Sequence, residues 1–155
     1  MKVLIVYDTV SPSKMTMTVA QTVGENLKER GIEVDSFYVE DVDKSTVKDY
    51  DCLIAGGPTM AFRASKGITQ FLDSLLSKEL KGKRAAAFDT QMKMVMSGNA
   101  AKGIEKKLKH LGFAIFKPPL VVYVESQSKN MWKFMTGELE KVENWAQEGV
   151  NALSV

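Results

Sequence analysis

The sequence predicts a single α/β domain, in which a doubly wound, five-stranded parallel sheet lies between two layers of helices. Three observations favour this three-layer α/β/α fold. Apolar strand patterns and amphipathic helix patterns alternate along the whole chain. The length of 155 residues suits one domain with a substantial core. Residues 1–155 contain no repeat and no low-complexity tract that would divide them.

Short apolar runs, of the kind that is buried on both faces of a parallel sheet, give the predicted strands. They occupy residues 3–7, 33–38, 52–55 and 85–88, followed by a last pair at 113–116 and 121–124. The third run contains Cys52, the single cysteine of the chain. We expect it to be an inert thiol in the core.

Four helices are predicted to begin near Thr16, Lys66, Asn99 and Gly137, and residues 41–50 are predicted to form a short helix or a loop. Each of the four has an apolar face with helical spacing. In chain order, these faces consist of Ala20, Val23 and Leu27; Ile68, Phe71, Leu72, Leu75 and Leu76; Ala101, Ile104, Leu108 and Leu111; and Leu139, Val142, Ala146 and Leu153. Gly31 and Gly112 follow the first and third of them, where glycine readily ends a helix.

Composition argues against several classes of function. The net charge of +2 is too small to indicate nucleic-acid binding, and no basic stripe interleaves with aromatic residues. No apolar run is long enough to be inserted in a membrane, and the chain opens directly into a strand, so we expect a cytoplasmic protein. One cysteine and one histidine, His110 at a charged helix end, argue against a metal site.

Three polar loops follow strands of the predicted sheet, at residues 8–15, 56–65 and 89–98. In open parallel sheets, ligands bind outside the carboxyl ends of the strands, so these loops are the candidate site. The first loop brings the hydroxyl groups of Ser11, Ser13 and Thr16 to the start of a helix. Helix amides and the helix dipole favour an anion there, and we expect a phosphate. The glycine-rich dinucleotide fingerprint and the Walker phosphate loop are both absent.

Motifs in all three loops resemble those of the flavodoxin family, which binds flavin mononucleotide (FMN). Ser11, Ser13 and Thr16 match the hydroxyl positions of that family's Ser-x-Thr-Gly-x-Thr loop, and Ala20 matches an alanine four residues later. The family's Gly-x-Pro-Thr and Phe-Leu-Asp-x-Leu motifs correspond to residues 56–59 and 71–75. Its Ser-Gly-Gly-Ala and Leu-Gly-Phe motifs correspond to residues 97–100 and 111–113. The resemblance covers nearly the whole chain.

The resemblance implies a flavodoxin-like, FMN-binding protein that transfers electrons to redox protein partners and has no catalytic residues of its own. The implied cofactor-binding residues are Thr9, Ser11, Ser13, Lys14, Met15, Thr16, Pro58, Thr59, Met60, Ala61, Phe62, Asp89, Thr90, Gln91, Ser97 and Gly98. Two alternatives stay open at this point. One is a binding or regulatory protein that has kept the fold and lost FMN, and the other is a flavin-dependent reductase or oxidase.

The first loop departs from the family pattern at the phosphate-binding glycine, where this chain has Lys14. The lysine either brings positive charge to the phosphate or obstructs the phosphate-binding loop. The third alternative is a lysine side chain that only contacts solvent. The loop is also about two residues longer than usual after the strand. Thr16 has the alternative role of a plain N-cap.

The second and third loops depart too. Met60 and Ala61 stand where flavodoxins keep glycine or asparagine near the flavin N5, and we expect them to resist a positive φ. Phe62 or Met60 either covers the flavin or packs on its own helix. The run from Met92 through Met94, Val95 and Met96 is a flavin-facing lid, a partner surface or a strand edge. The aromatics of residues 130–135 are expected to anchor the connection to the last helix.

Overall fold

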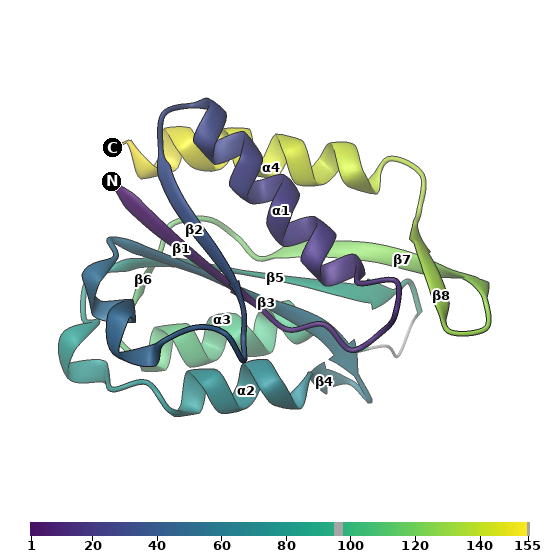
Figure 1. Ribbon diagram of the computed structural model, residues 1–155, viewed down its shortest axis with the longest axis horizontal. Coiled ribbons are helices and arrows are strands. Elements are labelled where there is room, and N and C mark those ends of the chain that lie inside the picture. Colours follow the sequence, from purple (N-terminus) through teal and green to yellow (C-terminus); the bar gives the residue numbers. More distant parts are fainter. Residues whose placement is uncertain (95–97, 155) are drawn as a thin grey trace.

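The computed structural model describes residues 1–94 and 98–154, and a parallel sheet forms its centre (Figure 1). Five strands run parallel in the order β2-β1-β3-β5-β7. In that spatial order, their bounds are Glu33–Tyr38, Lys2–Tyr7, Cys52–Met60, Arg84–Met92 and Leu120–Ser128. This arrangement confirms the predicted doubly wound α/β fold.

The predicted count of five strands was too low. β8 (Met131–Phe134) adds an antiparallel strand beyond β7, and β4 (Arg63–Ala64) pairs antiparallel with the end of β3. The short β6 (Ala114–Ile115) pairs with the start of β5, while β7 pairs with its end. Residues 131–134, expected to be part of a connection, form a strand because β7 continues to Ser128 and turns back through Asn130, whose φ is +61°.

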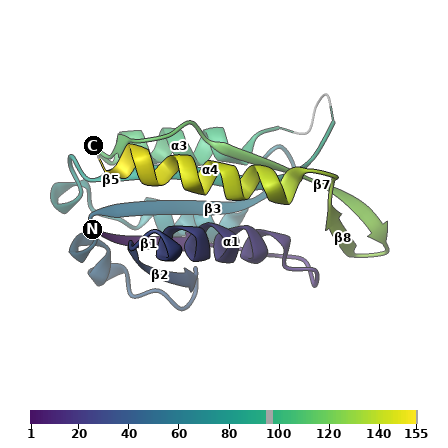
Figure 2. The same cartoon turned by 90° about the horizontal axis from the view of Figure 1, so that it is seen from above.

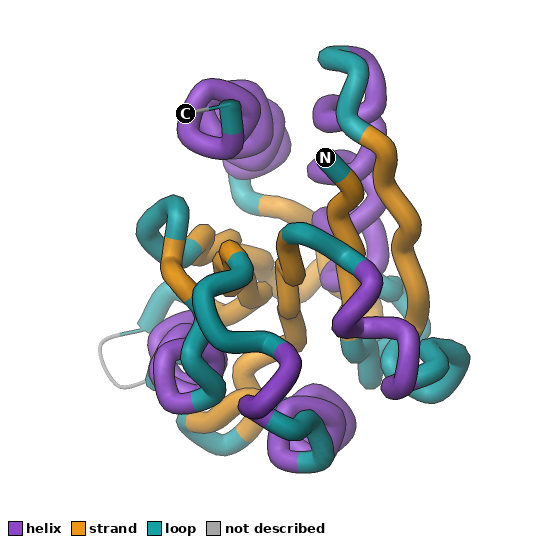
Figure 3. Tube along the Cα trace, turned by 90° about the vertical axis from the view of Figure 1, so that its left-hand side faces the viewer, coloured by secondary structure: helices purple, strands orange, loops and turns teal. Residues whose placement is uncertain are grey.

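Helices cover both faces of the sheet, as Figure 3 shows in a view along the strands. α1 (Met15–Glu29) and α4 (Glu138–Leu153) lie side by side on one face (Figure 2). α2 (Lys66–Asp73) and α3 (Ala100–His110) lie on the other (Figure 1). The 3₁₀ helices η1 (Lys44–Asp49) and η2 (Ser77–Glu79) flank them, and η1 is the short helix that the sequence allowed at residues 41–50. Among the described residues, no helix is both long and apolar enough to cross a membrane.

The strict alternation of side chains along the strands divides the core into two layers. Val3 and Ile5 of β1 pack in the layer beneath α1 and α4, whereas Leu4 and Val6 pack in the layer beneath α2 and α3. Cys52 is buried in the first layer, and desolvation raises the pKa of its thiol well above the usual value. The expectation of an inert core thiol is therefore confirmed.

Two residues predicted on buried helix faces are exposed instead. Leu76 has 74% of its surface exposed, because α2 ends at Asp73 and Leu76 lies outside the helix. Leu139, in the first turn of α4, is 39% exposed. Trp145 lies on the buried face of that helix, and its indole N–H donates to the carbonyl oxygen of Pro118 at 3.0 Å.

Candidate functional site

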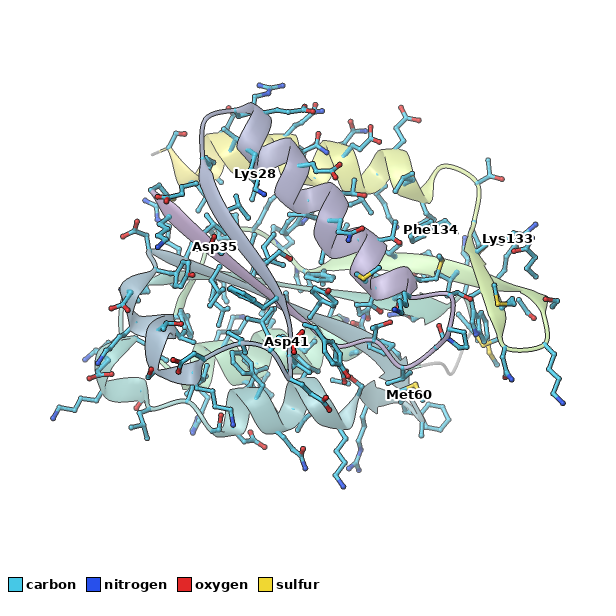
Figure 4. All side chains as sticks on the ribbon, viewed as in Figure 1. Lys28, Asp35, Asp41, Met60, Lys133 and Phe134 are labelled. Atoms are coloured by element: carbon cyan, nitrogen blue, oxygen red, sulfur yellow. The ribbon has the colours of Figure 1, made fainter. Side chains whose placement is uncertain are left out.

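The three candidate loops meet at the carboxyl ends of β1, β3 and β5. Figure 4 places Met60 at this end of the sheet, with Lys133 and Phe134 of β8 at the same end. Segments far apart in the sequence therefore surround one edge of the sheet, as parallel topology requires. The three loops that the sequence predicts to form the site thus lie together at one edge of the sheet.

The first loop leads directly into the start of α1. Helix α1 begins at Met15, and no side chain caps its N-terminus. Lys14 precedes it in the left-handed conformation, with φ 51° and ψ 44°, and its N–H donates to the carbonyl oxygen of Ser11 at 3.1 Å. The lysine has thus taken a backbone shape that glycine adopts easily, at a cost of about 1 kcal/mol. Its side chain is exposed, and no side chain caps the first-turn amides of α1.

Thr16 is buried and is not the N-cap of α1, so the capping role considered for it is wrong. Its hydroxyl oxygen lies 2.9 Å from that of Thr90, in a buried hydrogen bond that links the start of α1 to the end of β5. Two predicted site residues that are 74 positions apart are therefore in direct contact.

Ser13 is attached to β8. Its hydroxyl oxygen accepts a hydrogen bond from the backbone N–H of Trp132 at 2.7 Å and lies 3.9 Å from the sulfur of Met131. The hairpin of β7 and β8 is thereby held against the first loop. Sequence reasoning missed this contact, because it treated residues 130–135 as a connection. Thr9, Ser11 and Met15, the other predicted residues of this loop, are half-buried.

Asp8 is a buried residue of the first loop that sequence reasoning did not select. Its carboxylate accepts hydrogen bonds from the N–H of Thr9, at 2.9 Å, and from the hydroxyl of Ser65. A Cβ atom on Gly67 would lie 2.6 Å from the same carboxylate, so only glycine permits this approach to the start of α2. The helix dipole favours a negative charge there. Asp8 therefore ties the first loop to the second, and an aspartate directly after a buried strand was the available signal.

The second loop is a tight hairpin between β3 and β4. Met60 pairs with Arg63, and the two residues between them have positive φ, 46° at Ala61 and 73° at Phe62. Two successive positive φ angles match a type I′ turn. The expectation that Met60 and Ala61 resist positive φ is therefore wrong at Ala61, where hairpin geometry determines the turn, whereas Met60 has no positive φ. Phe62 is 63% exposed, so its ring is not buried against the helix that follows the second loop.

The second loop also contacts the third. Phe62 forms an isolated parallel bridge with Gly98, whose φ is 76°. A Cβ atom on Gly98 would lie 2.3 Å from the carbonyl oxygen of Phe62, so the backbones approach too closely for any side chain. Pro58 and Thr59 are half-buried just before the turn.

Asp89 organises the base of the third loop and is fully buried. Its carboxylate accepts hydrogen bonds from the N–H of Ala101 at 3.0 Å, the amide of Gln91 at 2.7 Å and the hydroxyl of Thr59 at 3.3 Å. The Thr59 hydroxyl oxygen in turn accepts from the N–H of Ala100 at 3.1 Å. Burial is the main cause that raises the pKa of Asp89, and these hydrogen bonds oppose it. Together, Asp89 and Thr59 fix the start of α3 to the end of β3.

The tip of the third loop is only partly described. Met92, the last residue of β5, is 43% exposed, and Met94 is 58% exposed. The predicted site residue Ser97 lies outside the described residues, as do Val95 and Met96. Within the described ranges, no group of three His, Cys, Asp or Glu residues is placed to bind a metal ion.

Comparisons with known proteins agree with this architecture. A family model described as flavodoxin matches residues 5–137. No curated protein sequence matches the chain at a significant level. Among solved structures, the chain is similar to a flavodoxin from the domain Archaea, with 19% identity over 100% of both chains and a TM-score of 0.78. It is also similar to oxidised flavodoxin 1 from Bacillus cereus, with 21% identity over 97% of this chain and 98% of that one and a TM-score of 0.77.

A larger protein contains a comparable domain. Rubredoxin oxygen:oxidoreductase from Desulfovibrio gigas is 22% identical over 99% of this chain but only 36% of that one, with a TM-score of 0.78. At these identities the solved structures show the shared fold, and the family match extends through all three loops. The chain therefore belongs to the flavodoxin family.

Proposed function

We propose that this protein binds FMN at the carboxyl edge of its sheet and carries electrons between redox proteins. The observation that carries the proposal is the start of α1, which has no side-chain cap and follows a left-handed Lys14. Free amides in this conformation, at the positive end of a helix dipole, suit a terminal phosphate. Membership of the flavodoxin family supports the same conclusion.

The residues present fit FMN. The first-turn amides of α1, with Ser11 and Lys14, would hold the phosphate, while Ser13 keeps β8 against the loop. Met60 and Phe62 of the second loop, with Met92 and Met94 of the third, present apolar surface for the flavin ring and exclude water from it. When bound, FMN supplies electron transfer chemistry, and the chain's contribution is binding, orientation and electrostatic tuning.

The distribution of reactive side chains favours a carrier over an enzyme with its own acid–base chemistry. The single histidine, His110, is exposed at the C-terminal end of α3, and the single cysteine is buried at the start of β3. Both positions lie at the amino end of the sheet, away from the three loops. Neither group is therefore placed to move a proton at a bound flavin.

The test is a titration of the purified protein with FMN and with riboflavin, followed by flavin fluorescence and visible absorption. We expect FMN to bind more tightly than riboflavin by a few kcal/mol, because riboflavin lacks the phosphate and its charge-assisted hydrogen bonds. Equal affinities would show that the start of α1 does not hold a phosphate. Failure to bind either flavin would refute the proposal as a whole.

A further inference from the structure

An open groove runs between α2 and α3. These two helices lie on the face of the sheet opposite α1 and α4 (Figure 1). Its floor includes Leu72 and Ile104, whose side chains belong to the core beneath these helices. One end of the groove is lined by Met60 and Phe62, the exposed apolar residues of the second loop. A protein bound in the groove would therefore also contact the edge of the candidate FMN site.

The charged side chains that line the groove are mostly cations. Arg63, Lys66 and Lys106 are exposed, and within the described part of the chain no carboxylate lies within 4.0 Å of them. The acidic residue of the lining, Asp73, is already paired with Lys107 at 2.7 Å. The groove thus presents unpaired positive charge, which complements an acidic surface and speeds its approach.

Exposed cations also occur in the first and third loops. Lys14 in the first loop and Lys93 in the third are exposed, while the two carboxylates of those loops, Asp8 and Asp89, are buried. The loops therefore extend the positive surface of the groove rather than oppose it. An acidic partner would meet complementary charge over both regions at once.

The groove also offers apolar contacts without an occupant in this chain. Leu76 is 74% exposed at one end and Phe62 is 63% exposed at the other. Gly103 of α3 also lines the groove. Apart from the backbone of its own helix, no atom of the described residues lies within 4 Å of the position that its Cβ would take. A glycine inside a helix is less stable than alanine by about 1 kcal/mol, and no packing contact with the described residues requires it here. Its effect is to leave this part of the groove open.

We propose that this groove docks an acidic electron-transfer protein, which inserts an apolar segment rimmed by carboxylates between α2 and α3. The redox role of that partner rests on the proposed function. Charge complementarity selects the partner, and the contact with Met60 and Phe62 brings it beside the flavin edge. Apolar anchors at both ends and a polar, charged rim match the usual anatomy of a protein interface.

The test uses an acidic [2Fe–2S] ferredoxin as the probe, fluorescently labelled and titrated with the FMN-loaded and with the flavin-free protein. Fluorescence anisotropy gives the Kd at several salt concentrations. We expect binding that weakens steadily with salt, and a Kd about tenfold higher for Lys66→Glu/Lys106→Glu. The matched control, Lys28→Glu/Arg30→Glu, makes the same change in net charge on exposed residues at the end of α1, on the opposite face (Figure 4 labels Lys28). It should bind ferredoxin as the unaltered protein does.

A second variant, Gly103→Leu, fills the groove without changing charge. We expect its Kd for ferredoxin to rise about fivefold with an unchanged salt dependence, while the melting temperature is kept or raised because the helix gains propensity. No ferredoxin binding, equal effects of the two charge reversals, or an unaltered Kd for Gly103→Leu would overturn the proposal. So would a homodimer in analytical ultracentrifugation that Lys66→Glu/Lys106→Glu dissociates, because the groove would then hold a second copy. Failure of FMN to bind leaves this readout intact, so the two proposals can fail separately.

Discussion

At the scale of single residues, Lys14 combines strain with charge at the start of α1. The left-handed conformation is costly for lysine, whereas its exposed ammonium group can attract the phosphate of FMN. These two effects are separable by substitution. The first concerns the stability of the flavin-free protein, and the second concerns only the affinity for FMN.

We predict that Lys14→Gly raises the free energy of unfolding of the flavin-free protein by about 0.5–1 kcal/mol, because glycine adopts positive φ without strain but is freer when unfolded. Lys14→Met should leave that free energy unchanged and weaken FMN roughly fivefold, because it keeps the strain and removes the charge. Urea unfolding and flavin titration measure the two quantities. If Lys14→Met binds FMN as tightly as the unaltered protein, the lysine is only a solvated side chain.

The pH dependence of stability gives a test of Asp89. Burial raises the pKa of Asp89 in the folded state. At a pH between the unfolded and the folded pKa, the folded protein therefore keeps a proton on Asp89 that the unfolded chain has released. The carboxyl group of Asp89 therefore stabilises the fold at pH values below its pKa in the unfolded chain. This contribution is lost as the pH rises through its pKa in the folded protein. We predict that the stability of the unaltered protein relative to Asp89→Asn falls as pH rises above about 4.

Urea unfolding of both proteins across the acidic pH range measures this difference. Asparagine keeps a side-chain oxygen that can accept from Ala101, so the comparison isolates the titration of the carboxyl group. A relative stability that increases with pH would mean that the hydrogen bonds from Ala101, Gln91 and Thr59 outweigh the desolvation of the carboxylate.

At the scale of elements, β8 extends the sheet and is attached to the first loop by the hydrogen bond from the Trp132 N–H to the Ser13 hydroxyl. We predict that Ser13→Ala makes the backbone amide of Trp132 exchange its hydrogen about fivefold faster, because one hydrogen bond of about 1 kcal/mol is lost. Hydrogen exchange followed by NMR measures the rate. Ser128→Ala, in the same hairpin, serves as the control and should leave the Trp132 rate unchanged, because among the described residues Ser128 has no hydrogen bond to the first loop.

Some elements of the fold could be predicted from the sequence and others could not, for physical reasons. The five parallel strands and the four helices could be predicted because the spacing of apolar residues along the sequence indicates them directly. β4 and β8 were missed because both are too short. β4 has two residues and β8 has four of mixed polarity, which is too few to show the alternation of apolar and polar residues that indicates a strand. Leu76 was misplaced because the apolar spacing continues after α2 has ended at Asp73.

Within the site, sequence reasoning found hydroxyl groups but not their partners. Thr16 and Thr90 were both selected, yet their contact depends on the crossing of α1 and β5, which spacing along the chain does not reveal. Asp8 was missed because its role requires a glycine at position 67, on another element. The positive φ of Ala61 and Phe62 was missed because residue preference was weighed without the hairpin that overrides it.

At the scale of the whole molecule, the predicted isoelectric point of 8.6 and the cations of the second and third loops bear on redox tuning. Reduction adds negative charge to a bound flavin, and nearby cations stabilise it. We predict that Arg63→Gln and Lys93→Gln each shift the one-electron potential of the final reduction step of bound FMN to more negative values by roughly 40 mV. That shift corresponds to about 1 kcal/mol for one electron and a partly screened charge. Spectroelectrochemical titration of the FMN-loaded protein measures this shift.

Lys28→Gln removes one positive charge at the far end of α1 and serves as the control. Its potential should match that of the unaltered protein, because separation and salt screen the charge. Shifts of equal size in all three variants would indicate an effect of net charge rather than of position, and would contradict the local account.

The links among the three loops also constrain how this site can change over evolutionary time. Asp8 joins Ser65, Thr16 joins Thr90, Thr59 joins Asp89, and Phe62 meets Gly98. The effect of a substitution in one loop therefore depends on residues in another, and we expect the three loops to change together in related proteins. Grafting any single loop from a relative into this chain should fail more often than grafting all three together, and compensating second-site changes should arise in the neighbouring loops.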